Sequence, residues 1–344
     1  MWSLYDQLFS SIFWCTGTVA IVVNCYLLYL IFFVAPSTLH VYRVFLANVA
    51  LGDLVFAAAT TFAQIRIIPN KWAFAYVSLG PAAYFGSEVS YIAYCVQLHA
   101  LFYTFLSFPL SFGFRYHVLI RPMPGVKRCI FICFCLWLVA FAQHILFICS
   151  QTEASFIREY LAINKPGYNI TDLVISGNHM IKNPLTAITL ATIVLPMFPI
   201  YVLVIYFYKK VHGYLDINTT NMREGTVKGH RRLVQALVIQ ASLPLLFIFP
   251  PILIYGLYHL EFINFTIIEY LVYVLFSFYP ATSPFVTLYF VKPFNLAVRR
   301  LVGLPVKKQI STVAPTLKLR RLLFNNDERA ESSIPGLSTY NKLL

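Results

Sequence analysis

Seven long apolar segments are the feature of this sequence that most restricts its fold. The third is the clearest, because no charged residue occurs between Val89 and Phe114. A transmembrane helix needs about 20 predominantly apolar residues, so a segment of this kind is long enough to cross a bilayer. The predicted spans are residues 9–34, 44–65, 89–114, 129–149, 185–208, 233–257 and 267–291. The sequence therefore predicts an all-α membrane protein, a bundle of seven transmembrane helices.

The composition agrees with this prediction. Of the 344 residues, 59% are hydrophobic and only 11% are charged. No soluble domain of this length can bury so much apolar surface, so we interpret residues 9–291 as one membrane domain after a short extracellular segment, residues 1–8. A net charge of +13 would indicate a nucleic-acid partner in a soluble protein, but here the basic residues lie between the apolar segments. The expected partner is therefore the lipid bilayer, and no nucleic acid.

The distribution of basic residues predicts the orientation. One side of the membrane receives 16 lysines and arginines and the other receives 5, counting the start of the tail with the first side. Because positive residues stay cytoplasmic, we expect the N-terminus outside and the C-terminus inside. Glycosylation sequons at Asn169 and Asn264 fall on the predicted outer side. A third sequon, at Asn218, falls on the inner side and is interpreted as a chance match.

The segment after the seventh span has a pattern of its own. Apolar side chains recur at helical spacing over residues 292–303, with Arg299 and Arg300 on the other side. This pattern predicts a short amphipathic helix on the inner leaflet. Residues 304–344 are interpreted as a cytoplasmic tail.

Asp53 and Asn24 are polar residues that fall inside predicted spans. Asp53 is the only carboxylate that we place deep in a span, where a charge costs roughly 2.5–3.5 kcal/mol or more. We expect it to face the interior and to be functional; a protonated or hydrogen-bonded structural residue is the alternative. Asn24 in the first span should also face the bundle. Pro244, Pro250 and Pro251 predict a kink in the sixth span, and Pro109 predicts a bend in the third. The seventh span contains Pro280 and Pro284.

The expected ligand site is a pocket between helices. Only about eight residues precede the first span, so we expect no external domain that could capture a large ligand. The candidate wall residues are Tyr91, Tyr94, Gln97, Tyr255, Tyr258, Glu269, Tyr270 and Tyr273. The alternative for each aromatic residue is an anchor at the membrane interface. His99 is interpreted as an interior histidine with internal partners.

Other functional classes find less support. A multi-span transporter or ligand-gated channel is the main alternative, but neither an internal repeat nor several intramembrane charges are present. A retinal protein would need a lysine in the seventh span, and residues 267–291 contain none. We find neither a His-Glu-x-x-His nor a Gly-x-Ser-x-Gly motif, so we expect no enzyme. The cysteines lie within or at the end of apolar segments, and we expect no metal site and no cofactor.

Several motifs resemble those of rhodopsin-like G-protein-coupled receptors. Residues 48–54 (Asn-Val-Ala-Leu-Gly-Asp-Leu) are similar to the span-two motif whose acid joins a sodium and water network. Ser283-Pro284 stands where that group has Asn-Pro in span seven, and Phe114-Arg115-Tyr116 closes span three. The resemblance implies that Arg115 contacts a G protein when the sixth span swings out; an ordinary headgroup anchor is the alternative. Since Phe114 replaces the usual acid, we expect another contact to restrain this arginine.

A closer resemblance is to nematode chemosensory receptors of the serpentine superfamily, first the delta class (Srd) within the Str group. It is carried by residues 41–48 (Val-Tyr-Arg-Val-Phe-Leu-Ala-Asn), 78–81 (Ser-Leu-Gly-Pro), 110–116 and Arg121-Pro122. It implies a plasma-membrane receptor of a sensory cilium. Such a receptor would bind an odorant or pheromone-like small molecule and activate a heterotrimeric G protein. The signalling residues expected are Asn24, Asp53, Arg115, Tyr116, Pro250 and Pro284.

Overall fold

The computed structural model describes residues 3–36, 39–217 and 224–305. All helices and strands of this described part lie in one compact unit, Met1–Leu301. The predicted tail, residues 304–344, lies outside the described residues except for its first two positions, as does the sequon at Asn218.

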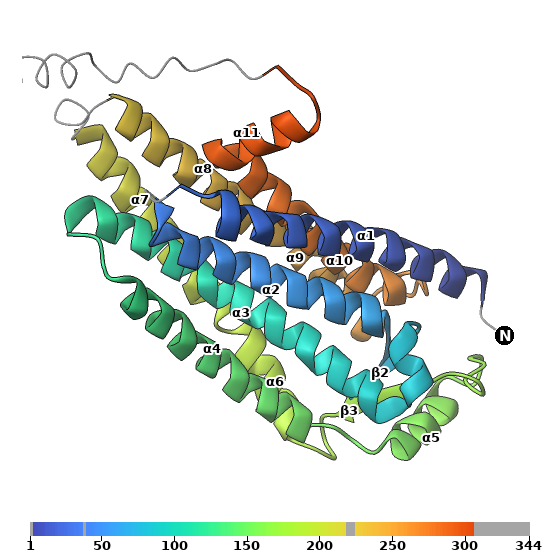
Figure 1. The fold of residues 1–344 in the computed structure, drawn as a ribbon. Helices are drawn as coiled ribbons and strands as arrows, with labels where there is room; N and C mark the ends of the chain where they lie inside the picture. Colours follow the sequence, from blue (N-terminus) through green and yellow to red (C-terminus); the bar gives the residue numbers. More distant parts are fainter. Residues whose placement is uncertain (1–2, 37–38, 218–223, 306–344) are drawn as a thin grey trace, which may run out of the picture. The chain divides into compact units, whose positions relative to one another are not determined.

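Seven helical segments of the described chain are long and apolar enough to cross a membrane, as predicted. Four are formed by single α-helices: α2 Tyr42–Ala63, α3 Ser87–Ile120, α4 Val126–Cys149 and α10 Ile268–Phe290. The first joins α1 Leu4–Tyr29 to a π-helical turn, η1 Leu30–Val34. The fifth consists of α6 Leu185–Val194 and α7 Met197–Ile217, and the sixth of α8 Glu224–Phe247 and α9 Phe249–His259. Figure 1 shows these helices side by side as a bundle.

Capping and proline residues explain where several helices begin or break. The first helix begins five residues before the predicted span because Ser3 and Asp6 form a capping box, in which each side chain accepts the other residue's backbone N–H. The sixth span breaks at Ile248, directly before Pro250 and Pro251 in the first turn of α9. Pro284, in contrast, lies inside an uninterrupted α10.

Close contacts between small residues bring the first two helices together. A Cβ atom on Gly17 would lie 1.9 Å from Oγ1 of Thr61, so no larger residue fits there without movement of the helices. Membrane helices associate through van der Waals packing rather than through exclusion of water, and small residues permit the backbones to approach. The third helix, α3, packs against α2, α4, α7 and α8 and is the most buried of the seven.

The connections at one end of the bundle form a sheet that the sequence analysis did not predict. Strands β1 Ile65–Asn70, β2 Ala73–Ser78 and β3 Ile175–His179 pair in antiparallel order β1-β2-β3. Residues 66–88, which the predicted spans leave as a connection, therefore contain most of this sheet. The 150–184 connection also contains a helix, α5 Ala154–Asn164. All residues of the three strands are buried, and the sheet and α5 lie at the end of the bundle where α1 begins (Figure 1).

The opposite end carries the helix that follows the seventh span. α11 spans Lys292–Leu301, with Phe294 fully buried and Arg299 and Arg300 in its last turn. It packs against α10 and the π-helical turn of the first span. The structure thus has one end covered by a sheet and another end where α11 turns across the bundle (Figure 1).

Candidate functional site

The predicted ligand-binding tyrosines gather beneath the sheet. Tyr94 of α3 and Tyr273 of α10 share a short hydrogen bond between their hydroxyl groups, and their ring centroids lie 5.5 Å apart. Tyr76 of β2 lies above them, with its ring centroid 4.4 Å from that of Tyr94. Tyr255 of α9 lies close to Phe74 of the same strand, with 6.4 Å between the ring centroids. The structure therefore joins three of the predicted residues to a strand that sequence reasoning did not include.

Gln97 lies one helical turn further into the membrane than Tyr94, on the same helix. Its side chain is fully buried, and among the described residues neither its amide oxygen nor its amide nitrogen has a hydrogen-bond partner. The hydroxyl of Tyr255 is also buried without a partner there. A buried polar group left without a hydrogen bond costs about 1–3 kcal/mol. These two side chains therefore offer free donors and acceptors to a molecule that enters this region.

Tyr91, another of the predicted ligand residues, forms hydrogen bonds between three elements. Its hydroxyl donates to the backbone oxygen of Phe147 at 2.8 Å and accepts from the amide of Asn178 at 2.9 Å. These bonds connect α3, α4 and β3. The hydroxyl has both a donor and an acceptor partner, so Tyr91 holds the sheet on the bundle, and its place in a ligand site stays a prediction.

Glu269 at the start of α10 is the centre of a buried network of charges. Its carboxylate accepts from Nε and Nη2 of Arg66 at 2.9 and 2.7 Å and from the hydroxyl of Tyr258 at 2.9 Å. Tyr168 donates to the same carboxylate at 2.5 Å. The predicted wall residues Glu269 and Tyr258 are thus hydrogen-bonded to each other. Both oxygens of the Glu269 carboxylate already accept hydrogen bonds from protein groups.

The same network reaches the first helix. Nη1 of Arg66 lies 3.4 Å from the carboxylate of Asp6, which also accepts from the hydroxyl of Tyr270 at 2.7 Å. The guanidinium carbon of Arg66 lies 4.5 Å from the centroid of the Tyr270 ring. We refer to these residues as the Glu269 cluster: Asp6, Arg66, Tyr168, Tyr258, Glu269 and Tyr270. It fastens β1 and the 150–184 connection to α1, α9 and α10.

The electrostatics of this cluster favour the charged arginine. Burial alone would lower the pKa of Arg66, but Glu269, Tyr270 and Asp6 act together against this effect and raise the pKa of Arg66 above its usual value. Burial, and then the same carboxylate, raise the pKa of Tyr168. The Tyr168 hydroxyl therefore remains protonated and keeps donating its hydrogen bond.

Arg115, the residue expected to contact a G protein, lies near the other end of α3. It is 5% exposed, and its guanidinium carbon lies 3.5 Å from the centroid of the Tyr42 ring in α2. Among the described residues, its Nε and Nη2 have no hydrogen-bond partner. Phe114, which replaces an acid, packs on Phe45 with 4.2 Å between ring centroids. The aromatic face of Tyr42 is thus a candidate for the contact expected in place of an ion pair, and that it restrains Arg115 stays a prediction.

Asn24 and Asp53, two of the other expected signalling residues, make polar contacts with α10. Nδ2 of Asn24 donates to the backbone oxygen of Pro280 at 3.0 Å, which connects α1 to α10. Asp53 is 1% exposed and faces Ser283 of α10. The amide of Gln240 in α8 donates to Thr287 of α10 at 2.9 Å, so polar contacts near the middle of the bundle join several helices.

Three further residues lie apart from these contacts. Pro284 is buried within α10, whereas Pro250 is exposed at the start of α9. Tyr116 is half-buried, and its ring centroid lies 6.4 Å from that of Phe207 in α7. The sequon residues Asn169 and Asn264 are both exposed in connections, where a glycan would meet no packed surface.

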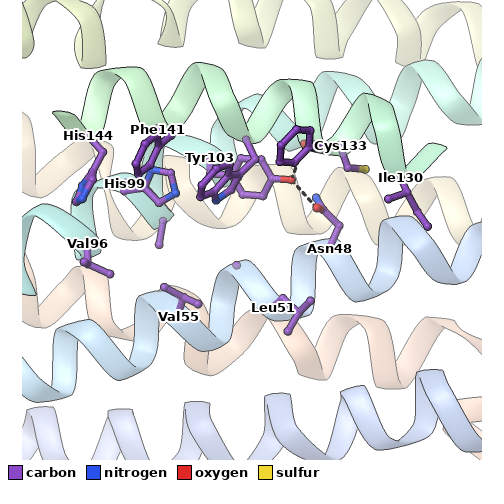
Figure 2. Close-up of a pocket in the computed structure, with 14 residues that line it drawn as sticks. Asn48, Leu51, Val55, Val96, His99, Tyr103, Ile130, Cys133, Phe141 and His144 are labelled. Carbon is purple, nitrogen blue, oxygen red and sulfur yellow. Dashed lines mark hydrogen bonds between the residues drawn. The ribbon is translucent and has the colours of Figure 1, made fainter. Parts of the chain in front are cut away.

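A cavity of about 650 Å³ lies between α2, α3 and α4 (Figure 2), and none of the predicted ligand residues lines it. We refer to it as the lateral pocket. It is lined by Asn48, Leu51, Gly52, Val55, Val96, His99, Ala100, Tyr103, Ile130, Cys133, Phe134, Trp137, Phe141 and His144. One sequence pattern does point to this pocket: His99 and Tyr103 are polar and lie one helical turn apart within an apolar span.

Comparisons with known proteins agree with this architecture. The family model described as serpentine type 7TM GPCR chemoreceptor Srd matches residues 9–300. Serpentine receptor class delta-18 of Caenorhabditis elegans is 27% identical over 306 residues, which cover 87% of this chain and 90% of that protein. Serpentine receptor class delta-1 of the same organism is 26% identical over 289 residues, 82% of this chain and 78% of that protein.

A solved structure shows the same fold. The crystal structure of squid rhodopsin superposes with a TM-score of 0.61 at 14% identity, covering 98% of this chain and 90% of that chain. The seven apolar helices make the protein a multi-pass membrane protein, and the matched family contains receptors and not enzymes, transporters or channels. The chain therefore belongs to the Srd family of nematode serpentine chemoreceptors, G-protein-coupled receptors of seven transmembrane helices.

Proposed function

We propose that this protein binds an odorant or pheromone-like small molecule between α3, α9 and α10 and thereby activates a heterotrimeric G protein. The observation that carries the ligand site is the unpaired, fully buried amide of Gln97 beneath Tyr94 and Tyr273. Together with the free hydroxyl of Tyr255, it supplies the few polar groups that a small-molecule site in an aromatic environment needs.

A ligand at this position would act on the contact that joins two spans. To reach Gln97 from the sheet, it has to displace the hydrogen bond between Tyr94 and Tyr273. Signalling follows if the ligand binds the rearranged helices more tightly than the arrangement described here, because only a difference in affinity shifts the population. The sheet lies on the ligand side of the proposed receptor, and α11 on the cytoplasmic side.

The orientation is part of this proposal. The excess of basic residues on the side of α11 supports a cytoplasmic C-terminus. The exposed sequons at Asn169 and Asn264 support an outer location for the sheet. The family suggests the plasma membrane of a sensory cilium as the place where the protein acts.

The proposal is tested by a G-protein readout in a heterologous cell with a panel of volatile and water-soluble small molecules. We expect at least one compound to activate the wild type, and Gln97→Leu to weaken the response by about 10-fold or more, since a hydrogen bond to ligand is replaced by apolar surface. The variant Gln143→Leu is the matched control, because the amide of Gln143 in α4 is also buried and unpaired but lies on another helix.

The coupling side of the proposal has its own variant. Arg115→Ala should abolish the response to the same compound while the surface level stays unchanged. A response that survives in Arg115→Ala would remove this arginine from the proposed mechanism. Equal responses of wild type and Gln97→Leu would place the ligand elsewhere.

A further inference from the structure

The lateral pocket opens toward the lipid and not toward the bundle interior. Leu51 and Val55 of α2 and Ile130 and Phe134 of α4 line it, and each of these side chains is exposed on the outside of its helix. The outside of a membrane-spanning helix faces hydrocarbon. A molecule dissolved in the bilayer can therefore enter this pocket sideways, without passing the sheet.

The shape of the pocket suits a long apolar body. Its lining on α4 extends from Ile130 to His144, which is about 21 Å at 1.5 Å per residue. Along this wall the rings of Phe134, Trp137 and Phe141 lie nearly parallel, with 14° between neighbouring planes. Gly52 on the facing helix has no side chain to fill the space. The walls are thus elongated and apolar.

The polar groups at the Asn48 end of the pocket already satisfy one another. The hydroxyl of Tyr103 donates to the side-chain oxygen of Asn48 (Figure 2). Nδ2 of Asn48 in turn donates to the hydroxyl of Ser107 at 3.3 Å. A ligand gains no hydrogen bond there unless it breaks one of these. The polar end of a bound molecule should therefore lie elsewhere.

The two histidines at the opposite end are not satisfied in this way. His99 and His144 lie next to each other, with ring centroids 5.3 Å apart (Figure 2). Nδ1 of His144 lies 3.1 Å from the backbone oxygen of Cys95, and because a carbonyl only accepts, this nitrogen carries the proton. In a neutral ring, Nε2 of His144 is then an acceptor. Nδ1 of His99 is buried without a partner among the described residues.

The geometry points to the lateral pocket as a binding site for a long-chain alcohol from the bilayer. Its hydrocarbon chain lies along the aromatic wall of α4, and its hydroxyl donates a hydrogen bond to the histidine pair. An uncharged hydroxyl fits this place better than a carboxylate, since a charge at membrane depth is costly. The site is separate from the region proposed for the chemical signal.

The experiment uses the full-length protein in phosphatidylcholine nanodiscs and a hexadecanol that carries a photoreactive diazirine in its chain. Mass spectrometry identifies the labelled peptides. We expect labelling of the pocket side of α4, and competition by unlabelled hexadecanol that is about 3- to 10-fold stronger than competition by its methyl ether or by hexadecane. The ether and the alkane have the same chain but no hydrogen to donate.

Two variants locate the site. The double variant His99→Phe/His144→Phe keeps both rings but removes their nitrogens, and we expect it to abolish the preference for alcohol over ether. The variant His117→Phe, the same kind of change elsewhere on α3, should leave the preference intact. Gly52→Leu should reduce labelling several-fold by filling the pocket. A Cβ atom at Gly52 would lie 3.7 Å or more from its neighbours, so this helix accepts a side chain.

The wild type alone can overturn the inference. If hexadecane and the ether compete as well as hexadecanol, the histidines contribute nothing and the pocket takes only ordinary acyl chains. Labelling of Val139, whose side chain is exposed but does not line the pocket, at the same level as Trp137 and Phe141 would have the same meaning; fragmentation of the labelled peptide assigns the modified residue. Neither result depends on G-protein coupling, so failure here is distinct from failure of the proposed function.

Discussion

A single aromatic ring, that of Tyr42 in α2, is the contact partner of the buried Arg115 guanidinium. Tyr42 covers the guanidinium of Arg115 at 3.5 Å from the ring centroid. A cation over a desolvated aromatic face is stabilised by about 0.5–2 kcal/mol. A ring of this kind restrains the arginine less strongly than a buried carboxylate would, and without adding a second charge to the membrane interior.

This contact predicts the effect of removing the ring. Tyr42→Leu should raise ligand-independent G-protein activation, because the equilibrium between inactive and active arrangements shifts by about 2- to 30-fold when 0.5–2 kcal/mol is lost. Tyr42→Phe keeps the aromatic face and should behave as wild type. Basal activation per receptor at the cell surface is the measurement.

The control is Tyr29→Leu, since Tyr29 is exposed on the first helix and has no contact with Arg115. If Tyr42→Phe raises basal activity as much as Tyr42→Leu, the hydroxyl and not the ring is responsible. Unchanged activity in both variants would show that Arg115 is restrained by something else.

At the scale of elements, the Glu269 cluster determines how firmly the sheet is attached to the bundle. Arg66→Met leaves the buried carboxylate of Glu269 without its cation, and we expect a loss of about 3–5 kcal/mol of stability. The measurement is the apparent Tm of the purified receptor. Lys71→Met, at the exposed turn between β1 and β2, removes the same charge without a buried partner and should have little effect.

The double variant Arg66→Met/Glu269→Gln distinguishes charge from packing. It should recover part of the lost stability, because an uncharged amide costs less to bury than an unpaired carboxylate. No recovery would mean that Arg66 acts mainly through its contacts with the tyrosine rings.

The junction of β3 with α5 should respond to pH. The imidazole of His179 lies between the rings of Phe156 and Tyr160, and its Nδ1 accepts from the backbone N–H of Lys182 at 3.0 Å. Burial, and then the charge of Lys182, lower the pKa of His179 below its ordinary value of about 6.5. The folded protein therefore binds the proton less readily than the unfolded chain does.

The sign follows from this difference. The stability that the neutral ring contributes is complete above the unfolded pKa and is lost as the pH falls through about 6.5 toward the lower folded pKa. Hydrogen exchange of the β3 and α5 amides should become faster between pH 7.5 and pH 5.5 in the wild type, after correction for intrinsic exchange. His179→Phe should remove most of this dependence; an equal pH effect in the variant would exclude His179 as its source.

At the scale of the whole molecule, the predicted topology has a direct test. In a glycosylating cell, Asn169→Gln and Asn264→Gln should each remove one glycan, seen as a step in gel mobility that a glycosidase also produces. Both residues must reach the outer side for this result. If neither variant changes the mobility and an antibody reaches the 150–184 connection only after permeabilisation, the orientation is reversed.

The seven-helix architecture was predictable because it depends on local composition. Apolar segments, and the absence of charge from Val89 to Phe114, reveal a membrane span without any knowledge of its neighbours. The same local signals identified Arg115, and the prediction that a contact other than an ion pair would hold it is consistent with the ring of Tyr42. Which ring this would be could not be predicted, since the two residues belong to different helices.

The features that could not be predicted from the sequence depend on residues that lie far apart in the chain. Glu269 was visible as an acid near a membrane end, but Arg66 lies 203 residues earlier and only the fold brings them together. The strand Ile65–Asn70 directly follows a span and contains Pro69, which disfavours a strand prediction. β3 lies about a hundred residues further along the chain, so the pairing of the strands leaves no local sequence pattern. Tyr91 and Gln97 differ for the same reason. The amide of Asn178 in β3 donates a hydrogen bond to Tyr91, whereas the amide of Gln97 has no partner among the described residues.

The capping of the first helix also determines where a reporter can be attached. The backbone N–H of Ser3 donates to one oxygen of the Asp6 carboxylate at 2.8 Å, while the other oxygen accepts from Tyr270 and Arg66. A fluorescent protein or epitope fused directly ahead of Ser3 would therefore pull on the same carboxylate that holds the sheet in place. Epitopes for counting receptors at the cell surface belong beside Asn264, in the exposed connection before α10.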